Sequence, residues 1–300
     1  MVEMNSRKAA IIGCGFVGSA SAFSLMESHL FSEIVLIDAD KDRAEGEALD
    51  ISHGLPFSKP MQIYAGTYRD ISDAAVVIVT AGAGQKPGET RLDLVKKNVA
   101  IFKSIIPEVA KYNRSGILLI VANPVDILTY VAKQLSGYPS NRVFGSGTVL
   151  DTARLKYLLG EHGDSEIAAW SSANVSGVPL FKFCNMRGHF HEEETSRRIA
   201  EEVKNSAYEI IKRKRATYYG IAMSVKRICE AIVRDEKSIL PISSIQNTEK
   251  INGVALSMPA IVGKQGVEGL VPIELSDEEQ AALQNSADTL KAVLKDVLEE

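Results

Sequence analysis

The stretch IIGCGFVGSA, residues 11–20, decides the fold of this chain. It joins an apolar run, KAAIIG, to a helical pattern, FVGSASAFSLMESHL, so its glycines stand at a strand-to-helix turn. Gly13 permits a tight turn, Gly15 lets the backbone approach a pyrophosphate, and Gly18 lets helix and strand pack closely. Spacing alone is weak because the chain has 22 glycines, but this context is typical of a dinucleotide-binding βαβ unit.

An acidic residue follows at the distance that such a unit requires. Asp38 ends the apolar run EIVLID, 20 residues after Gly18. A carboxylate there accepts hydrogen bonds from a ribose diol and repels a 2′-phosphate, while the amino terminus of the helix offers free N–H groups to phosphates. We therefore expect NAD as the cofactor, in preference to NADP. The alternative is a glycine-rich turn followed by a helix cap at a strand end.

The first half of the sequence alternates short apolar runs with longer helical patterns. The runs that predict buried strands are KAAIIG, EIVLID, MQIYAG, AAVVIVTAG, GILLIVANP and RVFGSG. Such alternation gives βαβ units with right-handed crossovers, so we expect an α/β fold with a Rossmann-type doubly wound parallel sheet as a dinucleotide-binding domain over residues 1–147.

From about Asp151 the pattern changes. Short alternating strands (WSSANVSGVPLFKF) precede two helical stretches, a hairpin-like region with PISS and SMPAIVG, and a last helix with a capping box of Ser276 and Glu279. Residues 148–300 are therefore expected to form an α+β substrate and catalytic domain.

Composition excludes several classes of function. A hydrophobic content of 45% and a charged content of 24% are those of an ordinary globular protein, and a net charge of −4 gives no reason to expect a nucleic-acid partner. No apolar run approaches the ~20 residues that span a bilayer, and the first residues lack a secretory signal pattern. Three widely spaced cysteines predict neither a disulfide framework nor a metal site. We expect a cytoplasmic protein with no membrane partner.

Four further stretches carry a family resemblance. They are TAGAGQKPGETRLDL (80–94), VANPVDILTY (121–130), GTVLDTARLKYLL (147–159) and GEHGDSE (160–166). Together they resemble the lactate/malate dehydrogenase family over nearly the whole chain, and its bacterial lactate branch more than its malate branch. The resemblance implies NAD-dependent L-lactate dehydrogenase activity, which is reversible hydride transfer between NADH and pyruvate. It also implies a homotetramer and a place in glycolysis, in the fermentation of pyruvate to lactate.

Reduction of a 2-keto acid needs a proton donor, a cation that polarises the carbonyl and a group that holds the carboxylate. His162 suits the first role because imidazole titrates near neutral pH. Asp151 would hold that ring in one tautomer, and Arg154 suits bidentate carboxylate binding. Positions matching these three residues carry the same roles in the family. The plainer interpretation makes Asp151 and Arg154 a helix cap and a surface ion pair.

The glycine-rich stretch 80–94 completes the expected site. We expect it to close over bound substrate, expel water and bring Arg91 against the carbonyl oxygen. Gln85 stands where malate dehydrogenases carry arginine, so a second carboxylate would be left unpaired and pyruvate is favoured over oxaloacetate. Asn123 matches a family position that contacts nicotinamide and substrate, and Thr217 one that borders the substrate methyl group. Gln85 could also be only a solvated loop residue.

The resemblance extends to the cofactor-binding positions. Besides Gly13, Gly15, Gly18, Asp38 and Asn123, it implies NAD contacts at Val17, Arg43, Tyr68, Gly82, Ala83, Ser104, Val121 and Ser146.

The match is interrupted before His162. The family has some fifteen or more residues between the segments matching YLLG and GEHGD, and here these segments are fused. A helix continuing from Asp151 would place His162 about 16 Å along its axis, too far for a hydrogen bond. Either the natural chain has further residues here, which the intact flanking motifs favour, or the connection is truly short. The family also has glycine where this chain has Arg215.

Two other functions therefore stay open. One is a malate or other 2-hydroxy-acid dehydrogenase, against which Gln85 argues. The other is a catalytically impaired NAD-binding protein, which a truly short connection before His162 would favour.

Overall fold

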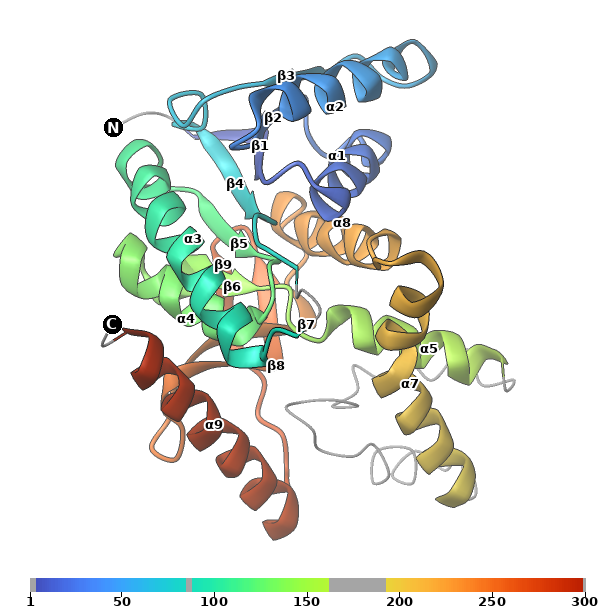
Figure 1. Cartoon of the computed structure of the whole chain (residues 1–300), viewed down its shortest axis with the longest axis vertical. Helices are drawn as coiled ribbons and strands as arrows, with labels where there is room; N and C mark the ends of the chain where they lie inside the picture. Colours follow the sequence, from blue (N-terminus) through green and yellow to red (C-terminus); the bar gives the residue numbers. More distant parts are fainter. Residues whose placement is uncertain (1–3, 85–87, 162–192, 299–300) are drawn as a thin grey trace.

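The computed structural model describes residues 4–84, 88–161 and 193–298. Its centre is a nine-stranded sheet with the order β3-β2-β1-β4-β5-β6-β7-β8-β9 (Figure 1). The strands are β1 (Asn5–Ile12), β2 (Glu33–Ile37), β3 (Gln62–Ala65), β4 (Ala74–Val79), β5 (Ile117–Ile120), β6 (Val143–Gly145), β7 (Ser238–Asn247), β8 (Asn252–Gly263) and β9 (Gly266–Leu270). Strands β1 to β6 pair in parallel and β6 to β9 antiparallel. The predicted doubly wound parallel sheet is confirmed.

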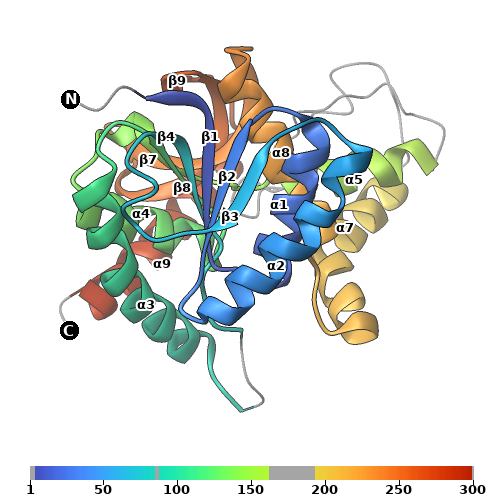
Figure 2. The same ribbon diagram turned by 90° about the horizontal axis from the view of Figure 1, so that it is seen from above.

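Helices cover both faces of this sheet (Figure 2). One face carries α1 (Phe16–Ser28), α2 (Lys41–His53) and α8 (Tyr219–Val233), and the other carries α3 (Arg91–Tyr112), α4 (Val125–Ser136) and α9 (Asp277–Leu298). Helices α5 (Val149–Glu161) and α7 (Glu193–Lys214) pack against each other beside the sheet. Two short 3₁₀ turns, η1 (Leu55–Phe57) and η2 (Ser140–Arg142), complete the described elements.

The apolar runs form strands because both of their faces are buried. Along β1, Ala9 and Ile11 belong to the core under α1, α2 and α8, whereas Ala10 and Ile12 belong to the core under α3, α4 and α9. Strands β4 and β5 divide between the two cores in the same alternating way. Period-two geometry with apolar residues on both faces is what a doubly covered parallel sheet requires.

The carboxyl-terminal half extends the same sheet. The predicted hairpin is the antiparallel pair β7–β8, in which Pro241 lies opposite Pro259. The predicted capping box of the last helix is present, because the Ser276 N–H donates to the Glu279 carboxylate at 2.7 Å and the Glu279 N–H to the Ser276 hydroxyl at 3.3 Å. The expected strand region WSSANVSGVPLFKF lies outside the described residues.

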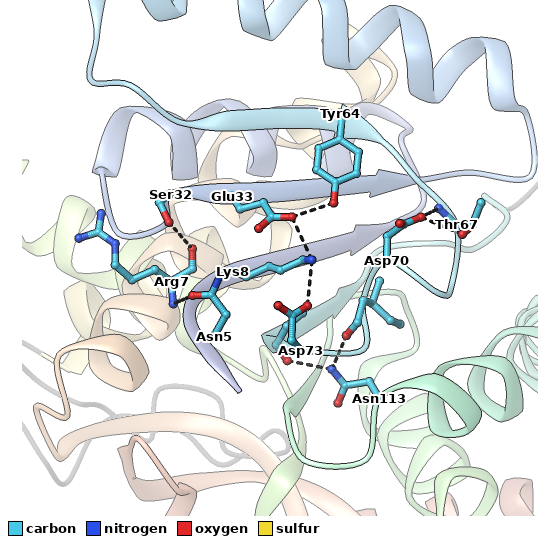
Figure 3. A network of polar contacts seen from close by, with 12 residues as sticks. Asn5, Arg7, Lys8, Ser32, Glu33, Tyr64, Thr67, Asp70, Asp73 and Asn113 are labelled. Atoms are coloured by element: carbon cyan, nitrogen blue, oxygen red, sulfur yellow. Dashed lines mark hydrogen bonds and ion pairs between the residues drawn. The ribbon is translucent and has the colours of Figure 1, made fainter. Parts of the chain in front are cut away.

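A polar network ties together β1, β2, β3 and the residue before β4 (Figure 3). The Lys8 ammonium, which is 6% exposed, lies 2.9 Å from carboxylate oxygens of both Glu33 and Asp73. The Tyr64 hydroxyl donates to Glu33 at 2.7 Å. Burial alone would lower the pKa of Lys8, but the bonds to Asp73 and Glu33 outweigh it and the pKa is raised. This edge is therefore a structural brace, opposite the edge where a dinucleotide would bind.

Among the helices that the structure describes, none is long and apolar enough to cross a membrane.

Candidate active site

The glycine turn after β1 has the geometry that its sequence requires. Gly13 has a φ of 100°, and a Cβ there would lie 2.5 Å from the Ala81 backbone nitrogen. At Gly18 a Cβ would lie 1.8 Å from the Gly13 carbonyl oxygen, so helix α1 reaches the strand only without a side chain there. At Gly15 a Cβ would meet nothing within 4 Å, so this face of the turn is open to a ligand.

The same turn offers hydrogen-bond donors and a carboxylate. Helix α1 begins after Gly15 without a side-chain cap, which leaves its first N–H groups to a ligand. The Asp38 carboxylate accepts the Cys14 N–H at 2.5 Å and the Asp40 N–H at 2.9 Å, and so stands directly beside the turn. Burial and then the Asp38 charge raise the pKa of the Cys14 thiol to about 12, so this cysteine is an inert filler.

These groups fit NAD. A bare helix amino terminus accepts a pyrophosphate, the open Gly15 face lets it approach the backbone, and a strand-end carboxylate accepts the two hydroxyls of a ribose. The Asp38 charge also opposes a 2′-phosphate.

The remaining predicted cofactor residues fall mostly at the carboxyl ends of the parallel strands. Gly82 and Ala83 follow β4, Val121 follows β5 and Ser146 follows β6. The pKa of Tyr68 is raised by burial and then by the charges of Glu108 and Asp38. Val17 and Arg43 lie in the first turns of α1 and α2. Ser104 stands apart, because it is exposed in the middle of α3 and its hydroxyl donates to the Ile101 carbonyl at 2.7 Å.

A buried asparagine that the sequence analysis missed joins two of these strand ends. Asn98 of α3 is 1% exposed. Its Oδ1 accepts the Ala83 N–H at 2.7 Å, and its Nδ2 donates to the carbonyls of Ala83 at 3.3 Å and of Asn123 at 2.7 Å. The signal was present in the sequence, since Asn98 interrupts the apolar stripe of α3 between Val95 and Phe102.

Two of the predicted substrate residues line one cavity. Arg91 and Asn123 border a cavity of about 690 Å³ together with residues of α3, α4, α7 and α9. The Arg91 guanidinium donates to the Tyr208 hydroxyl at 3.1 Å, so helix α7 supplies a wall of this space.

The other predicted substrate and catalytic residues do not line this cavity in the described part of the chain. Arg154 and Asp151 form an ion pair of 2.8 Å, with 15% and 30% of their side chains exposed, and neither is among the described residues lining the cavity of Arg91. Thr217 lies half-buried in the connection from α7 to α8. Gln85 and His162 lie outside the described residues. Helix α5 continues through Gly160 to Glu161.

Metal chemistry has no candidate ligand cluster in residues 4–84, 88–161 and 193–298. No group of three His, Cys, Asp or Glu side chains there could hold an ion.

A doubly wound sheet with this glycine turn and strand-end carboxylate is typical of a dinucleotide-dependent oxidoreductase. The family models sharpen this class: the NAD-binding domain of lactate/malate dehydrogenase matches residues 7–145, and its alpha/beta C-terminal domain matches residues 146–300. The chain belongs to the lactate/malate dehydrogenase family.

Similar proteins share one name. The L-lactate dehydrogenase of Acetivibrio thermocellus is 52% identical, with 96% of this chain and 96% of that protein covered. That of Thermoanaerobacterium saccharolyticum is 52% identical, with 96% and 98% covered. Among solved structures, the minor L-lactate dehydrogenase of Enterococcus mundtii superposes with a TM-score of 0.88 at 41% identity, covering 99% of this chain and 100% of that one.

The match to the Acetivibrio thermocellus protein is longer than this chain. It extends over 307 positions, more than the 300 residues of this chain. The Acetivibrio thermocellus protein therefore carries residues that have no counterpart here.

Proposed function

We propose that this protein is an NAD-dependent L-lactate dehydrogenase that interconverts pyruvate and L-lactate. The observation that carries the proposal is the match of both halves of the chain to relatives of that name at 52% identity. The NAD-compatible turn at Gly13, Gly15 and Asp38 supports it independently.

The chain's own residues supply what pyruvate reduction needs beyond the hydride that NADH donates when bound. Arg91, at the start of α3, is proposed to polarise the substrate carbonyl, and Arg154 to bind the carboxylate through its paired N–H groups. His162 is proposed to protonate the nascent alkoxide, with Asp151 orienting its ring. Asn123 and Thr217 are proposed to border the substrate, and Gln85 to exclude a second carboxylate.

The existing Asp151–Arg154 pair supports this assignment in part. A guanidinium that is 15% exposed and bonded to one carboxylate has a fixed orientation and spare N–H groups for a second carboxylate. A solvated surface pair, the plainer interpretation, would leave both side chains in water.

The connection after α5 sets a condition on the mechanism. Because α5 runs unbroken to Glu161, this last described residue of the helix lies about 15 Å along the axis from Asp151 at 1.5 Å per residue. We infer that an active enzyme has further residues between α5 and His162, and that the extra positions of the Acetivibrio thermocellus protein belong there. The intact mass of the purified natural protein checks this: a value near 32.6 kDa means that the connection is truly short.

Initial rates of NADH oxidation with pyruvate and with oxaloacetate test the function. We expect pyruvate to give the higher kcat/KM, because a neutral residue at position 85 leaves the second carboxylate of oxaloacetate unpaired. Faster turnover of oxaloacetate would make the protein a malate dehydrogenase. Binding of NADH without turnover of either acid would make it an impaired NAD-binding protein.

We also propose a homotetramer in the cytoplasm that serves the fermentative end of glycolysis. An exposed apolar surface between α1 and α8 supports self-association, because Phe16, Phe23, Tyr219 and Met223 are each more than half exposed there. Light scattering after size-exclusion chromatography tests the proposal, and a protomer mass at micromolar concentration would contradict it.

A further inference from the structure

The Asn98 side chain contacts the backbone after both β4 and β5, where residues of the proposed site lie. Its carboxamide pairs with the N–H and the carbonyl of Ala83 as one peptide group pairs with another, and its second N–H donates to the Asn123 carbonyl. Both N–H donors and the oxygen therefore have hydrogen-bond partners, so no polar atom of this buried amide is left unsatisfied.

The position of this amide links cofactor and substrate groups. Gly82 and Ala83 follow β4 on the cofactor side, while the side chain of Asn123 lines the cavity that Arg91 shares. Asn98 lies seven residues after Arg91 on the same helix, flanked by the buried Val95 and Phe102. Because packing fixes helix α3, the Asn98 amide holds the backbone at Ala83 and the backbone at Asn123 at a constant distance from each other.

We propose that Asn98 is a positioning residue that holds Ala83 against NAD and Asn123 against the substrate at one spacing. This inference rests on the proposed function. Asn98 need not touch either ligand; its effect on catalysis passes through the backbone at Ala83 and Asn123.

The variant Asn98→Asp tests the proposal with little change of shape. Aspartate keeps the acceptor for the Ala83 N–H but loses both donors, and it turns a negative oxygen toward the carbonyls of Ala83 and Asn123. We expect kcat/KM for pyruvate to fall about 10- to 100-fold, because small misplacements of reacting groups cost rates of that order. NADH binding, followed by fluorescence without substrate, should weaken several-fold.

The same helix provides a matched control. Asn113, fully buried just after α3, donates to the carbonyls of Ile71 and Ala74 and accepts the N–H groups of Ser115 and Gly116 at the opposite edge of the sheet. Asn113→Asp removes the same two donors, so it should lower the melting temperature while leaving kcat/KM and NADH affinity within about two-fold of wild type.

The outcomes separate this inference from the proposed function. If Asn98→Asp lowers only the melting temperature and leaves kcat/KM and NADH affinity unchanged, as expected for Asn113→Asp, then Asn98 is merely structural and the inference is wrong. If the wild type fails to reduce pyruvate, the proposed function fails, while the NADH titration still decides whether Asn98 positions Ala83. Should Asn98→Asp not fold, Asn98→Ser, which removes the bonds without adding a charge, is judged by the same two measurements.

Discussion

We propose that a single carboxylate, that of Asp38, sets the preference of this site for NAD over NADP. Asp38 stands beside the glycine turn and accepts the N–H groups of Cys14 and Asp40. Replacement by alanine removes both the acceptor for a ribose diol and the charge that opposes a 2′-phosphate. We expect Asp38→Ala to lower kcat/KM with NADH about 10- to 100-fold, which is the effect of losing a charged hydrogen bond. The preference for NADH over NADPH, measured as the ratio of the two kcat/KM values, should become smaller. Steady-state rates with both nucleotides measure this.

The change at Asp38 needs a control for local unfolding. Asp40 caps helix α2 by accepting the Arg43 N–H at 3.2 Å, and Asp40→Ala removes a carboxylate from the same loop without touching the glycine turn. An unchanged ratio of NADH to NADPH usage in Asp38→Ala would show that this carboxylate does not read the ribose.

At the level of residues, sequence reasoning found the groups whose chemistry is visible in a motif. The turn at Gly13 and the carboxylate at Asp38 lie together as their spacing requires. Asn98 interrupts the apolar stripe of α3, but no motif indicates which backbone groups its side chain contacts, because Ala83 and Asn123 lie outside that helix. The Arg91–Tyr208 bond could not be predicted either, since it joins residues 117 positions apart.

The carboxyl end of α7 carries a strained residue. Arg215 has a φ of 69° and its N–H donates to the Ile211 carbonyl at 2.7 Å, which makes it the left-handed residue that ends the helix. Side chains disfavour this conformation by about 1 kcal/mol relative to glycine. We therefore expect Arg215→Gly to raise the free energy of unfolding by about 1 kcal/mol in urea denaturation.

Glycine at a neighbouring position should have the opposite effect on the free energy of unfolding. Lys212 is exposed within the last turn of the same helix, where glycine should lower stability by roughly 0.5–1 kcal/mol. Equal effects of glycine at positions 212 and 215 would mean that the left-handed conformation of Arg215 costs nothing.

The brace at the amino-terminal edge of the sheet is a second element-level feature. Removing the ammonium by Lys8→Met leaves Glu33 and Asp73 facing each other without a counter-charge. We expect a loss of about 2–4 kcal/mol of unfolding free energy, because breaking a buried pair strands its charged partners. Urea denaturation at pH 7 measures this loss.

An exposed pair provides the comparison for Lys8. Lys111 lies 3.6 Å from Glu108 on the solvent face of α3, and Lys111→Met should leave stability nearly unchanged. A Lys8→Met variant as stable as Lys111→Met would show that the brace contributes nothing.

The six parallel strands and the β7–β8 hairpin were predictable because each is bounded by a local pattern. Doubly buried runs such as AAVVIVTAG, and a hairpin region such as PISS with SMPAIVG, need no knowledge of the rest of the chain. The continuation of the sheet from β6 into antiparallel β7 could not be predicted, because that pairing joins Phe144 to Ser244 across a hundred residues.

At the scale of the whole molecule, one continuous nine-stranded sheet supports both parts of the proposed site. These parts are the NAD-compatible glycine turn and the cavity lined by Arg91 and Asn123. The proposed catalytic histidine adds a requirement for a longer connection after α5 than the 300 residues provide. Fold and cofactor thus follow from contiguous motifs, whereas the reaction depends on how distant segments meet.

Transfer of an isotope label tests the proposed reaction most directly. The purified protein is supplied with pyruvate and with NADH that carries deuterium at the transferable C4 position, and the product is analysed by NMR and by chiral chromatography. We expect L-lactate that carries deuterium on C2. Unlabelled lactate, the D enantiomer, or no lactate from a protein shown to bind NADH would contradict it.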